Sequence, residues 1–283
     1  MEINTVAVIG GGTMGNGIAH IFALNKFDTY LIEQNKETGK KALSTISTNL
    51  ERQIAKELIT TDEKQETLSR IMLLDRIDNQ TYNSDLYIEA IYENKTAKLN
   101  IYKEILNNSK AESIIATNTS ALSITELAPE QKPDKFIGMH FMNPVPMMKL
   151  VEIIRGYSTS ESTYQEIRDL AIKLSKEPVE VFDYPGFVSN RILMPMINEA
   201  IFCLMEGVAS AKDIDTVMKL GMNHPMGPLA LADFIGLDIC LDIMNVLYSG
   251  YNDSKYRACP LLKKMVAAKK LGKKTGEGFY KYI

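Results

Sequence analysis

Three glycines near the N-terminus and an acidic residue beyond them have the spacing of a dinucleotide-binding loop. Gly10, Gly12 and Gly15 form the pattern G-x-G-x-x-G. In such a loop the first glycine permits a tight turn, the second lets a pyrophosphate approach, and the third lets helix and strand pack closely. Glu33 follows about 20 residues later, where an acid accepts hydrogen bonds from the adenine ribose and repels a 2′-phosphate. The pattern therefore favours NAD as cofactor, while Lys36 close by keeps NADP open as the alternative.

The segments around this loop are those that the motif requires. Thr5–Ile9 is apolar and rich in β-branched residues, which is typical of a buried parallel strand. Asn16–Leu24 has the spacing of a helix, and Thr29–Ile32 is a second predicted strand that ends at Glu33. A glycine-rich turn without a ligand is the alternative, but this context favours anion binding at the helix N-terminus. The predicted loop contacts to the cofactor are Gly10, Gly11, Gly12, Thr13, Met14 and Gly15.

Histidine is the side chain best suited to exchange a proton with an alcohol near neutral pH, as a nicotinamide dehydrogenase requires. The chain has three histidines. His20 lies in the helix behind the glycine loop, and His224 lies in a turn before a proline, so structural roles are favoured for both. His140 ends the apolar strand Phe136–His140, and ligands of open α/β sheets bind at the carboxyl ends of strands. We therefore predict that His140 is the acid–base group.

Glu152 lies inside the apolar segment Leu150–Ile154, where a charge is costly unless it is paired. It is either an outward-facing residue on an edge strand or the carboxylate that orients the His140 imidazole and stabilises its protonated form. The sequence leaves both interpretations open. Asn190 is polar among apolar residues and Ser120 follows a strand, which makes both candidates for the site. Helix capping is the alternative for each.

The elements that must position these residues alternate between strand and helix. Two helices, Lys36–Leu58 and Asp62–Met72, form a polar excursion that is longer than a single crossover helix. Beyond it the alternation predicts a mostly parallel, doubly wound Rossmann-type sheet. The predicted strands are Asp85–Ala90, Ser113–Thr117, Lys135–Phe141, Leu150–Ile154 and Pro178–Phe182, with helices at Lys95–Leu106 and Ser160–Leu174.

After a turn at Asp183–Gly186 the strand pattern stops. The sequence therefore predicts two domains: an α/β domain with a helical excursion at residues 1–184, and an all-α domain at residues 185–283. A proline, Pro195, is expected to kink the first helix of the second domain. The predicted helices of that domain are Phe187–Gly207, Lys212–Leu220, Gly227–Tyr248 and Cys259–Leu271.

The composition argues against several other classes of protein. The 283 residues are 45% hydrophobic and 24% charged, which is ordinary for a globular protein. No apolar run approaches the ~20 residues of a membrane span, and Met1–Asn4 lacks the basic start and apolar stretch that are typical of a signal peptide. A net charge of −3 argues against a general nucleic-acid binder. The spacing of the three cysteines matches no zinc pattern, so we expect no metal site and a reduced, cytoplasmic protein.

The blocks of sequence around these residues resemble those of the L-3-hydroxyacyl-CoA dehydrogenase family from end to end. The most specific block runs from Met139 to Glu152. The resemblance implies reversible, NAD-dependent oxidation of an L-3-hydroxyacyl-CoA, with (S)-3-hydroxybutyryl-CoA and acetoacetyl-CoA as the expected pair, in fatty-acid or butanoate metabolism. The other matching blocks are Val8–Gly15, Ile88–Asn94, Ala116–Ser120, Pro185–Asn190, His224–Pro228 and Lys273–Tyr280.

The resemblance also implies roles for residues at matching positions. His140 resembles the catalytic base and Glu152 its partner. Ser120 and Asn190 resemble residues that bind the reacting oxygen and position the substrate. The family often has aspartate where this chain has Glu33, which leaves the fine cofactor preference open. The positions that match cofactor contacts are Glu33, Glu93, Lys98, Ser120, Asn143 and Lys274.

Coenzyme A would meet basic residues of the helical excursion. Lys56 matches a coenzyme A contact, and Arg52 lies one helical turn before it. Such side chains can bind phosphates, although a solvated helix face is the alternative for Arg52. Ser120 completes the predicted substrate contacts. The resemblance further implies a homodimer or higher homo-oligomer formed through the C-terminal domain.

Three other functions compete with this one. A reductase of free 3-hydroxy acids shares the architecture but typically uses a catalytic lysine in the helical domain, whereas this chain carries His140 and Glu152. A structural protein is a second alternative, since lens lambda-crystallin is similar to the family. A domain of a larger fatty-acid oxidation complex is the third. The chain starts at the first strand and ends just after Tyr280, so we expect a freestanding enzyme.

Overall fold

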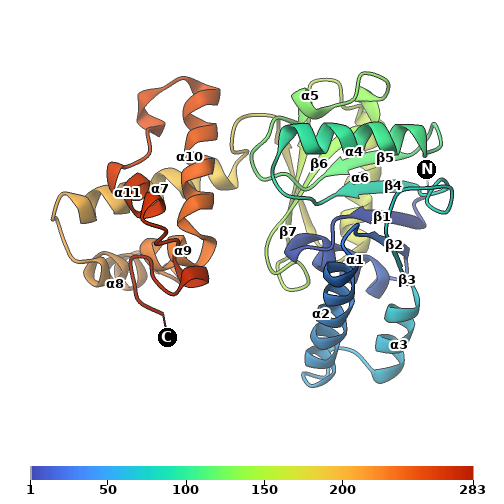
Figure 1. The fold of residues 1–283 in the computed structure, drawn as a ribbon, viewed down its shortest axis with the longest axis horizontal. Helices are drawn as coiled ribbons and strands as arrows, with labels where there is room; N and C mark the ends of the chain where they lie inside the picture. The colour runs from blue at the N-terminus through green and yellow to red at the C-terminus, as the bar shows by residue number, and fades with distance from the viewer. Residues whose placement is uncertain (1, 283) are drawn as a thin grey trace. The chain divides into compact units, whose positions relative to one another are not determined.

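The computed structural model describes residues 2–282. The chain divides into two compact units, Met1–Asp183 and Tyr184–Ile283 (Figure 1). The division lies next to the domain boundary expected from the sequence. Each unit has a hydrophobic core of its own. No helix within the described residues is both long and apolar enough to cross a membrane.

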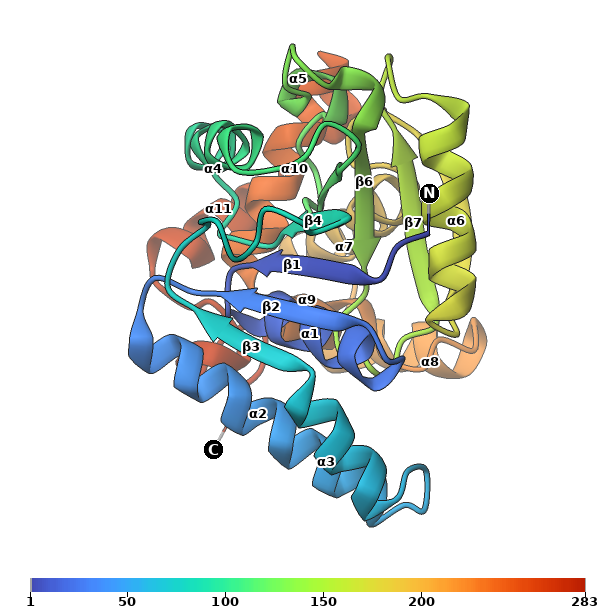
Figure 2. The ribbon, with the colours of Figure 1, turned by 90° about the vertical axis from the view of Figure 1, so that its right-hand side faces the viewer.

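A single twisted sheet forms the centre of the first unit (Figure 2). Its strands within the described residues are β1 (Thr5–Ile9), β2 (Asp28–Ile32), β3 (Ile71–Leu74), β4 (Leu86–Glu89), β5 (Ile114–Thr117), β6 (Phe136–Phe141), β7 (Leu150–Arg155) and β8 (Glu177–Phe182).

The order of these strands is β3-β2-β1-β4-β5-β6-β7-β8. All neighbours pair in parallel except β6 and β7, which are antiparallel. The first six strands therefore have the 3-2-1-4-5-6 order of a dinucleotide-binding sheet. The predicted Rossmann-type class is confirmed, and the carboxyl ends of β1, β2, β4, β5 and β6 meet at one edge.

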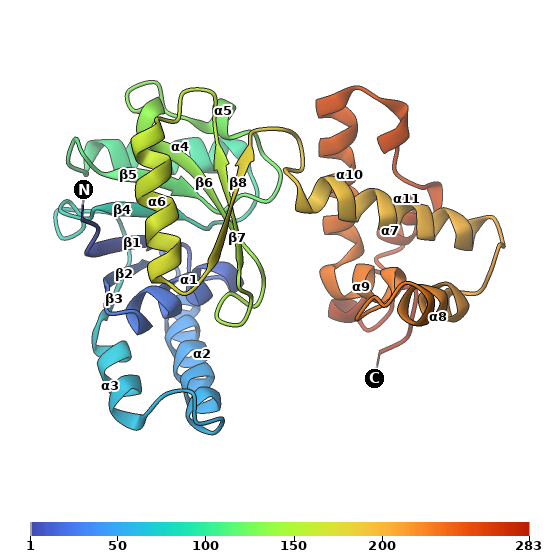
Figure 3. The same cartoon turned by 180° about the vertical axis from the view of Figure 1, so that it is seen from behind.

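Helices cover both faces of the sheet. In Figures 1 and 3, α4 and α6 lie on opposite faces, while α2 and α3 form a pair that projects from the sheet. Side chains of α1 and α6 share the main core with β1, β6 and β7. The helices of this unit are α1 (Thr13–Leu24), α2 (Lys36–Ile54), α3 (Thr61–Ser69), α4 (Lys95–Asn107), α5 (Ile124–Leu127), α6 (Glu161–Lys173) and the short 3₁₀ turn η1 (Pro133–Lys135).

The end of the helical excursion differs from the prediction. A helix was expected over Asp62–Met72, but α3 ends at Ser69 and Ile71–Leu74 forms β3. Leu73 packs so closely on α2 that a Cβ at Gly39 would lie 2.9 Å from its Cδ1. Pairing with β2 satisfies the backbone of this segment, and that partner is distant in sequence. Tertiary pairing thus outweighed the local helical pattern.

In the second unit the regular elements within the described residues are all helices, as predicted, and two isolated β-bridges join Glu277 to Gly272 and Lys281. The helix expected over Gly227–Tyr248 is instead two helices, because Gly236 has a φ of +108° and ends the first of them. Pro195 lies inside a helix that nevertheless continues as one element. The elements are α7 (Ser189–Met205), α8 (Ala211–Gly221), α9 (Pro228–Ile235), α10 (Leu237–Tyr251), α11 (Pro260–Ala267), η2 (Ser254–Tyr256) and η3 (Lys273–Thr275).

Candidate active site

The glycine loop joins β1 to α1 at the carboxyl edge of the sheet. Gly10 has a φ of +106°, and a Cβ there would lie 2.6 Å from the carbonyl oxygen of Ala90. A Cβ on Gly15 would lie 1.8 Å from the carbonyl oxygen of Gly10. At Gly12, by contrast, no described atom lies within 4 Å of such a Cβ. The loop is therefore tightly packed at its ends and open where the amides of α1 can receive a phosphate.

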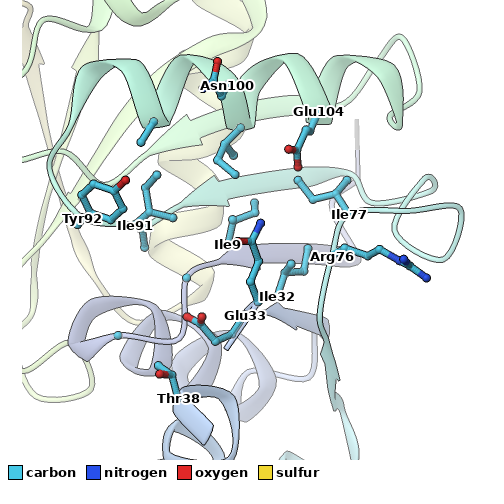
Figure 4. A pocket seen from close by; sticks show the side chains of 16 residues that line it. Ile9, Ile32, Glu33, Thr38, Arg76, Ile77, Ile91, Tyr92, Asn100 and Glu104 are labelled. Carbon is cyan, nitrogen blue, oxygen red and sulfur yellow. The ribbon is translucent and has the colours of Figure 1, made fainter. Parts of the chain in front are cut away.

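Glu33 is held beside this loop at the end of β2. One carboxylate oxygen accepts a hydrogen bond from the Gly11 amide at 2.8 Å, and the other accepts one from the Asn35 amide at 3.0 Å. Together with Gly10 and Gly12, Glu33 lines a cavity of about 500 Å³ (Figure 4). The acid that the sequence assigns to the ribose is thus fixed next to the predicted phosphate site.

The same cavity has walls that suit a flat aromatic base. Several isoleucines line it. Among them, Ile32 ends β2, Ile77 follows β3, Ile91 follows β4, and Ile101 lies in α4. Figure 4 shows Ile32, Ile77 and Ile91 around the space above Glu33. An apolar slot next to a fixed carboxylate and an open helix N-terminus fits the adenosine half of a dinucleotide.

His140 and Glu152 are brought together by the antiparallel pairing of β6 with β7. The register places the two residues opposite each other, and Nδ1 of His140 lies 2.7 Å from Oε2 of Glu152. Only 8% of His140 and 2% of Glu152 are exposed. Because β7 lies between β6 and β8, the interpretation of Glu152 as an outward residue on an edge strand is wrong. The pair lies near the carboxyl end of β6.

The other two histidines lie in different surroundings. His20 is fully buried in α1, and this burial lowers its pKa from 6.5 to about 4, so the ring is neutral near pH 7. His224 lies in the loop before α9, where its backbone amide donates to the carbonyl oxygen of Met218 at 3.1 Å. Both placements agree with the structural roles favoured from the sequence.

Three predicted cofactor contacts form one network at the ends of β4 and β5. The Glu93 carboxylate accepts hydrogen bonds from the Thr119 hydroxyl and, at 3.1 Å, from the Ser120 amide. The ammonium of Lys98 lies 3.1 Å from the same carboxylate. Lys98 is only 1% exposed, so its charge acts mainly inside this network. Glu93, Lys98 and Ser120 are therefore placed by one another.

A buried acid that the sequence reasoning missed anchors this network. Glu89, at the end of β4, is fully buried and accepts hydrogen bonds from Lys98 at 2.7 Å and 2.9 Å. It also accepts from the hydroxyls of Tyr102 at 2.8 Å and Thr117 at 2.7 Å. Burial, together with the charge of Glu89, raises the pKa of Tyr102 well above its usual value. The sequence pattern could have indicated Glu89, because it is a charged residue at the end of an apolar strand. A similar pattern, a charged residue within an apolar strand, indicated Glu152.

Asn143 lies in the loop between β6 and β7. It lines a second cavity beside the glycine loop, together with Gly12, Thr13 and Asn16. The end of β6, just before this loop, is bonded to the segment after β5, where Asn118 Oδ1 accepts a hydrogen bond from the Phe141 amide at 3.0 Å. Asn143 therefore adjoins the predicted phosphate site, although 128 residues of chain or more separate it from the glycines.

The two predicted coenzyme A contacts lie at the far end of the projecting pair. The predicted helix Lys36–Leu58 ends earlier than expected, so Lys56 follows α2 in a turn. Lys56 and Arg52 are exposed, and Arg52 donates to the side chain of Asn49 at 3.3 Å. Neither lines the second cavity. The residues of α2 that do are Thr38, Lys41, Ala42, Thr45 and Asn49.

Two predicted site residues belong to the helical unit. Asn190 lies in the first turn of α7, is 7% exposed, and donates its backbone amide to the Gly186 carbonyl at 3.1 Å. Lys274 lies in η3 with its ammonium 2.6 Å from the Asp238 carboxylate. The residues predicted for the site thus come from both units of the chain.

Comparison with known proteins relates both units to one family. Residues 5–184 match the NAD binding domain of 3-hydroxyacyl-CoA dehydrogenase, and residues 186–282 match its C-terminal domain. The chain is 52% identical over 283 residues to a probable 3-hydroxybutyryl-CoA dehydrogenase of Bacillus subtilis, covering 100% of this chain and 98% of the relative. It is 49% identical over 278 residues to the 3-hydroxybutyryl-CoA dehydrogenase of Clostridioides difficile, covering 98% of this chain and 99% of the relative.

A solved structure shows the same likeness. The crystal structure of (S)-3-hydroxybutyryl-CoA dehydrogenase from Ralstonia eutropha superposes with a TM-score of 0.96 at 47% identity, covering 100% of both chains. The resemblance noted in the sequence is confirmed over the full length. With its NAD-binding sheet and its helical second unit, this chain belongs to the 3-hydroxyacyl-CoA dehydrogenase family.

Proposed function

We propose that this protein catalyses the reversible, NAD-dependent oxidation of (S)-3-hydroxybutyryl-CoA to acetoacetyl-CoA, with His140 as general acid–base and Glu152 as its partner. The observation that carries the proposal is the buried 2.7 Å contact between His140 Nδ1 and Glu152 Oε2 near the carboxyl end of β6. Similarity at about half of all positions to relatives that bear this name supports the substrate.

The proposed acid–base step uses the two ring nitrogens of His140 differently. Nδ1 is bound to Glu152, so Nε2 takes the proton of the 3-hydroxyl group. The carboxylate of Glu152 stabilises the imidazolium as it forms, because the pair is largely shielded from water. In the reverse direction the protonated ring donates the same proton to the alkoxide that forms at C3.

The glycine loop and Glu33 would hold the cofactor. When bound, NAD would supply the acceptor for the hydride from C3, and NADH would supply the hydride in the reverse direction. Ser120 and Asn190 position the reacting oxygen in this proposal. The contacts proposed for the nicotinamide half are Glu93, Lys98, Ser120, Asn143 and Lys274.

The rest of the substrate would extend over the projecting helices. Lys56 and Arg52 are the proposed phosphate contacts, together with Ser120. Self-association through the helical unit is part of the same proposal. Large apolar side chains exposed on that unit support it, among them Ile192, Val208, Val217 and Leu220.

A substrate comparison tests the function directly. Oxidation of NADH and of NADPH is followed by absorbance with acetoacetyl-CoA and with free acetoacetate. We expect rapid oxidation of NADH with acetoacetyl-CoA and little with the free acid, because only the thioester carries the coenzyme A that the basic residues would bind. Activity confined to the free acid would show that the enzyme is a hydroxy-acid reductase.

Replacement of Glu33 by alanine tests the cofactor site. The change removes the carboxylate that lines the cavity together with Gly10 and Gly12 of the glycine loop. We expect NADH to bind about tenfold more weakly, since two charge-assisted hydrogen bonds to the ribose are lost. Fluorescence titration with NADH and NADPH measures the effect. An unchanged affinity for NADH would show that Glu33 does not bind the ribose.

A further inference from the structure

A buried lysine lies behind the loop that joins the two strands of the His140–Glu152 pair. Lys176 is 9% exposed, and its ammonium donates hydrogen bonds to the carbonyl oxygens of Val145 at 2.6 Å and Met148 at 2.7 Å. Within residues 2–282 its hydrogen-bond acceptors are these two carbonyl oxygens, and no carboxylate offsets the effect of burial on its pKa. Burial lowers the pKa of Lys176, which is the cost of holding this cation inside the unit.

The end of α6 delivers Lys176 to this place. Ser175 has a φ of +57°, and the Lys176 amide donates back to the Ala171 carbonyl at 3.0 Å, so the helix ends in a Schellman-type turn. The chain then enters β8, where the Glu177 amide donates to the Lys149 carbonyl at 2.8 Å. The backbone thus joins the end of the loop, and the Lys176 side chain reaches into its middle.

The segment 142–149 is the loop that Lys176 holds. It contains a turn of its own, in which the Pro144 carbonyl accepts from the amides of Met147 and Met148 at 3.0 Å. Val145 is 1% exposed and presses on α1, where a Cβ at Gly17 would lie 2.9 Å from its Cβ. The loop is therefore fixed between Lys176 on one side and the helix that follows the glycine loop on the other.

We propose that Lys176 is a positioning residue, whose ammonium holds segment 142–149 against α1 so that Asn143 keeps its place beside the glycine loop. A single Nζ has three N–H groups and can serve two carbonyl oxygens at once. An apolar side chain at this position would leave both carbonyls without a donor, a larger loss than that of an exposed hydrogen bond. The proposal rests on the proposed function, in which Asn143 contacts the cofactor.

The positive charge of Lys176 also affects the buried His20 of α1. Burial is the main cause of its lowered pKa, of about 4, and the positive charge of Lys176 lowers it further. A neutral His20 avoids a second cation next to Lys176.

The test compares Lys176→Met with Lys173→Met, which changes an exposed lysine on α6 in the same way. Three quantities are measured on each full-length protein: amide hydrogen exchange, the dissociation constant of NADH by fluorescence, and the melting temperature. In Lys176→Met we expect the amides of segment 142–149 to exchange about tenfold faster and NADH to bind about tenfold more weakly. Exchange in β1 and β4 stays as in the wild type, and Lys173→Met matches the wild type throughout.

Unchanged NADH affinity in a folded Lys176→Met protein would overturn the proposal. A lower melting temperature with unchanged affinity would mean that Lys176 stabilises the fold but does not position Asn143. Lys176→Arg keeps the positive charge and has N–H donors for both carbonyls, so it is expected to recover part of the exchange protection and NADH affinity that Lys176→Met loses. If Lys176→Met does not fold, Lys176→Gln is used in its place. Its amide exchange and NADH affinity are then compared with those of the wild type and of Lys173→Met, with the same criteria.

The exchange measurement separates this proposal from the proposed function. A wild-type protein that binds NADH but does not reduce acetoacetyl-CoA would contradict the proposed function. Faster exchange of segment 142–149 together with weaker NADH binding in Lys176→Met would still support the role of Lys176. Conversely, an active enzyme whose NADH affinity does not depend on Lys176 would refute only the role of Lys176.

Discussion

Replacement of His140 by glutamine is expected to lower the turnover of acetoacetyl-CoA by about 10²–10⁴-fold, the contribution of a positioned acid–base group. Glutamine is close in size to histidine and can still bond to Glu152, but it cannot take up or release a proton near neutral pH. The strand pairing of β6 with β7 rests on backbone bonds that the change leaves in place. Steady-state kinetics with saturating NADH and acetoacetyl-CoA measure the effect.

The same substitution at another histidine provides the control. His224 lies in a loop of the helical unit and bonds through its backbone, so His224→Gln is expected to retain turnover. NADH affinity is expected to match the wild type in both variants, because neither residue lines the cavity beside Glu33. Turnover of His140→Gln within about threefold of the wild type would rule out His140 as the acid–base group.

Replacement of Glu152 by glutamine is expected to lower turnover by about 10²–10⁴-fold. If the new amide donates to Nδ1, the ring proton is forced onto Nε2, which then cannot accept the substrate proton. If the amide oxygen accepts from Nδ1, the tautomer is correct, but the imidazolium loses the carboxylate that stabilises it. Both arrangements are slower, and the loss is large because Glu152 is only 2% exposed.

Glu130→Gln is the matched control for this variant, since Glu130 is an exposed acid of the same unit. The dissociation constant of NADH is expected to be the same in Glu152→Gln, Glu130→Gln and the wild type. A loss of NADH binding that parallels the loss of turnover in Glu152→Gln would instead mean that the residue maintains the cofactor site. Stopped-flow measurement of hydride transfer distinguishes the two results.

The parts of the site that the sequence predicted are those with a local pattern. The glycine loop is read from spacing and from the strand and helix that flank it, because turn, strand and helix N-terminus are neighbours in the chain. His140 could be selected because it ends an apolar strand, and strand ends of such sheets meet at one edge. Glu33 could be selected because it ends the strand that follows the glycine loop, and it lines the cavity beside that loop.

For two buried acids, the sequence indicated that a partner is needed, but the role of each acid depends on which residue that partner is. Glu152 and Glu89 are both acids in apolar strands, which indicates that each needs a partner but does not name it. The antiparallel register of β6 and β7 selects His140 for Glu152, and the packing of α4 selects Lys98 for Glu89. The alternation of elements predicted a mostly parallel sheet, but it did not indicate which two neighbouring strands are antiparallel.

By itself, then, the sequence determined the class of fold, the cofactor loop and the identity of the acid–base candidate, because these depend on periodicity and spacing within a few turns of chain. Only the tertiary structure decided that Ile71–Leu74 is a strand, that Gly236 divides a helix, and that Lys176 bonds to a loop about 30 residues away. Such choices depend on contacts between distant segments, whose free energy is gained only when the whole unit has assembled. Local preferences cannot express that energy, and so these features appear only in the folded chain.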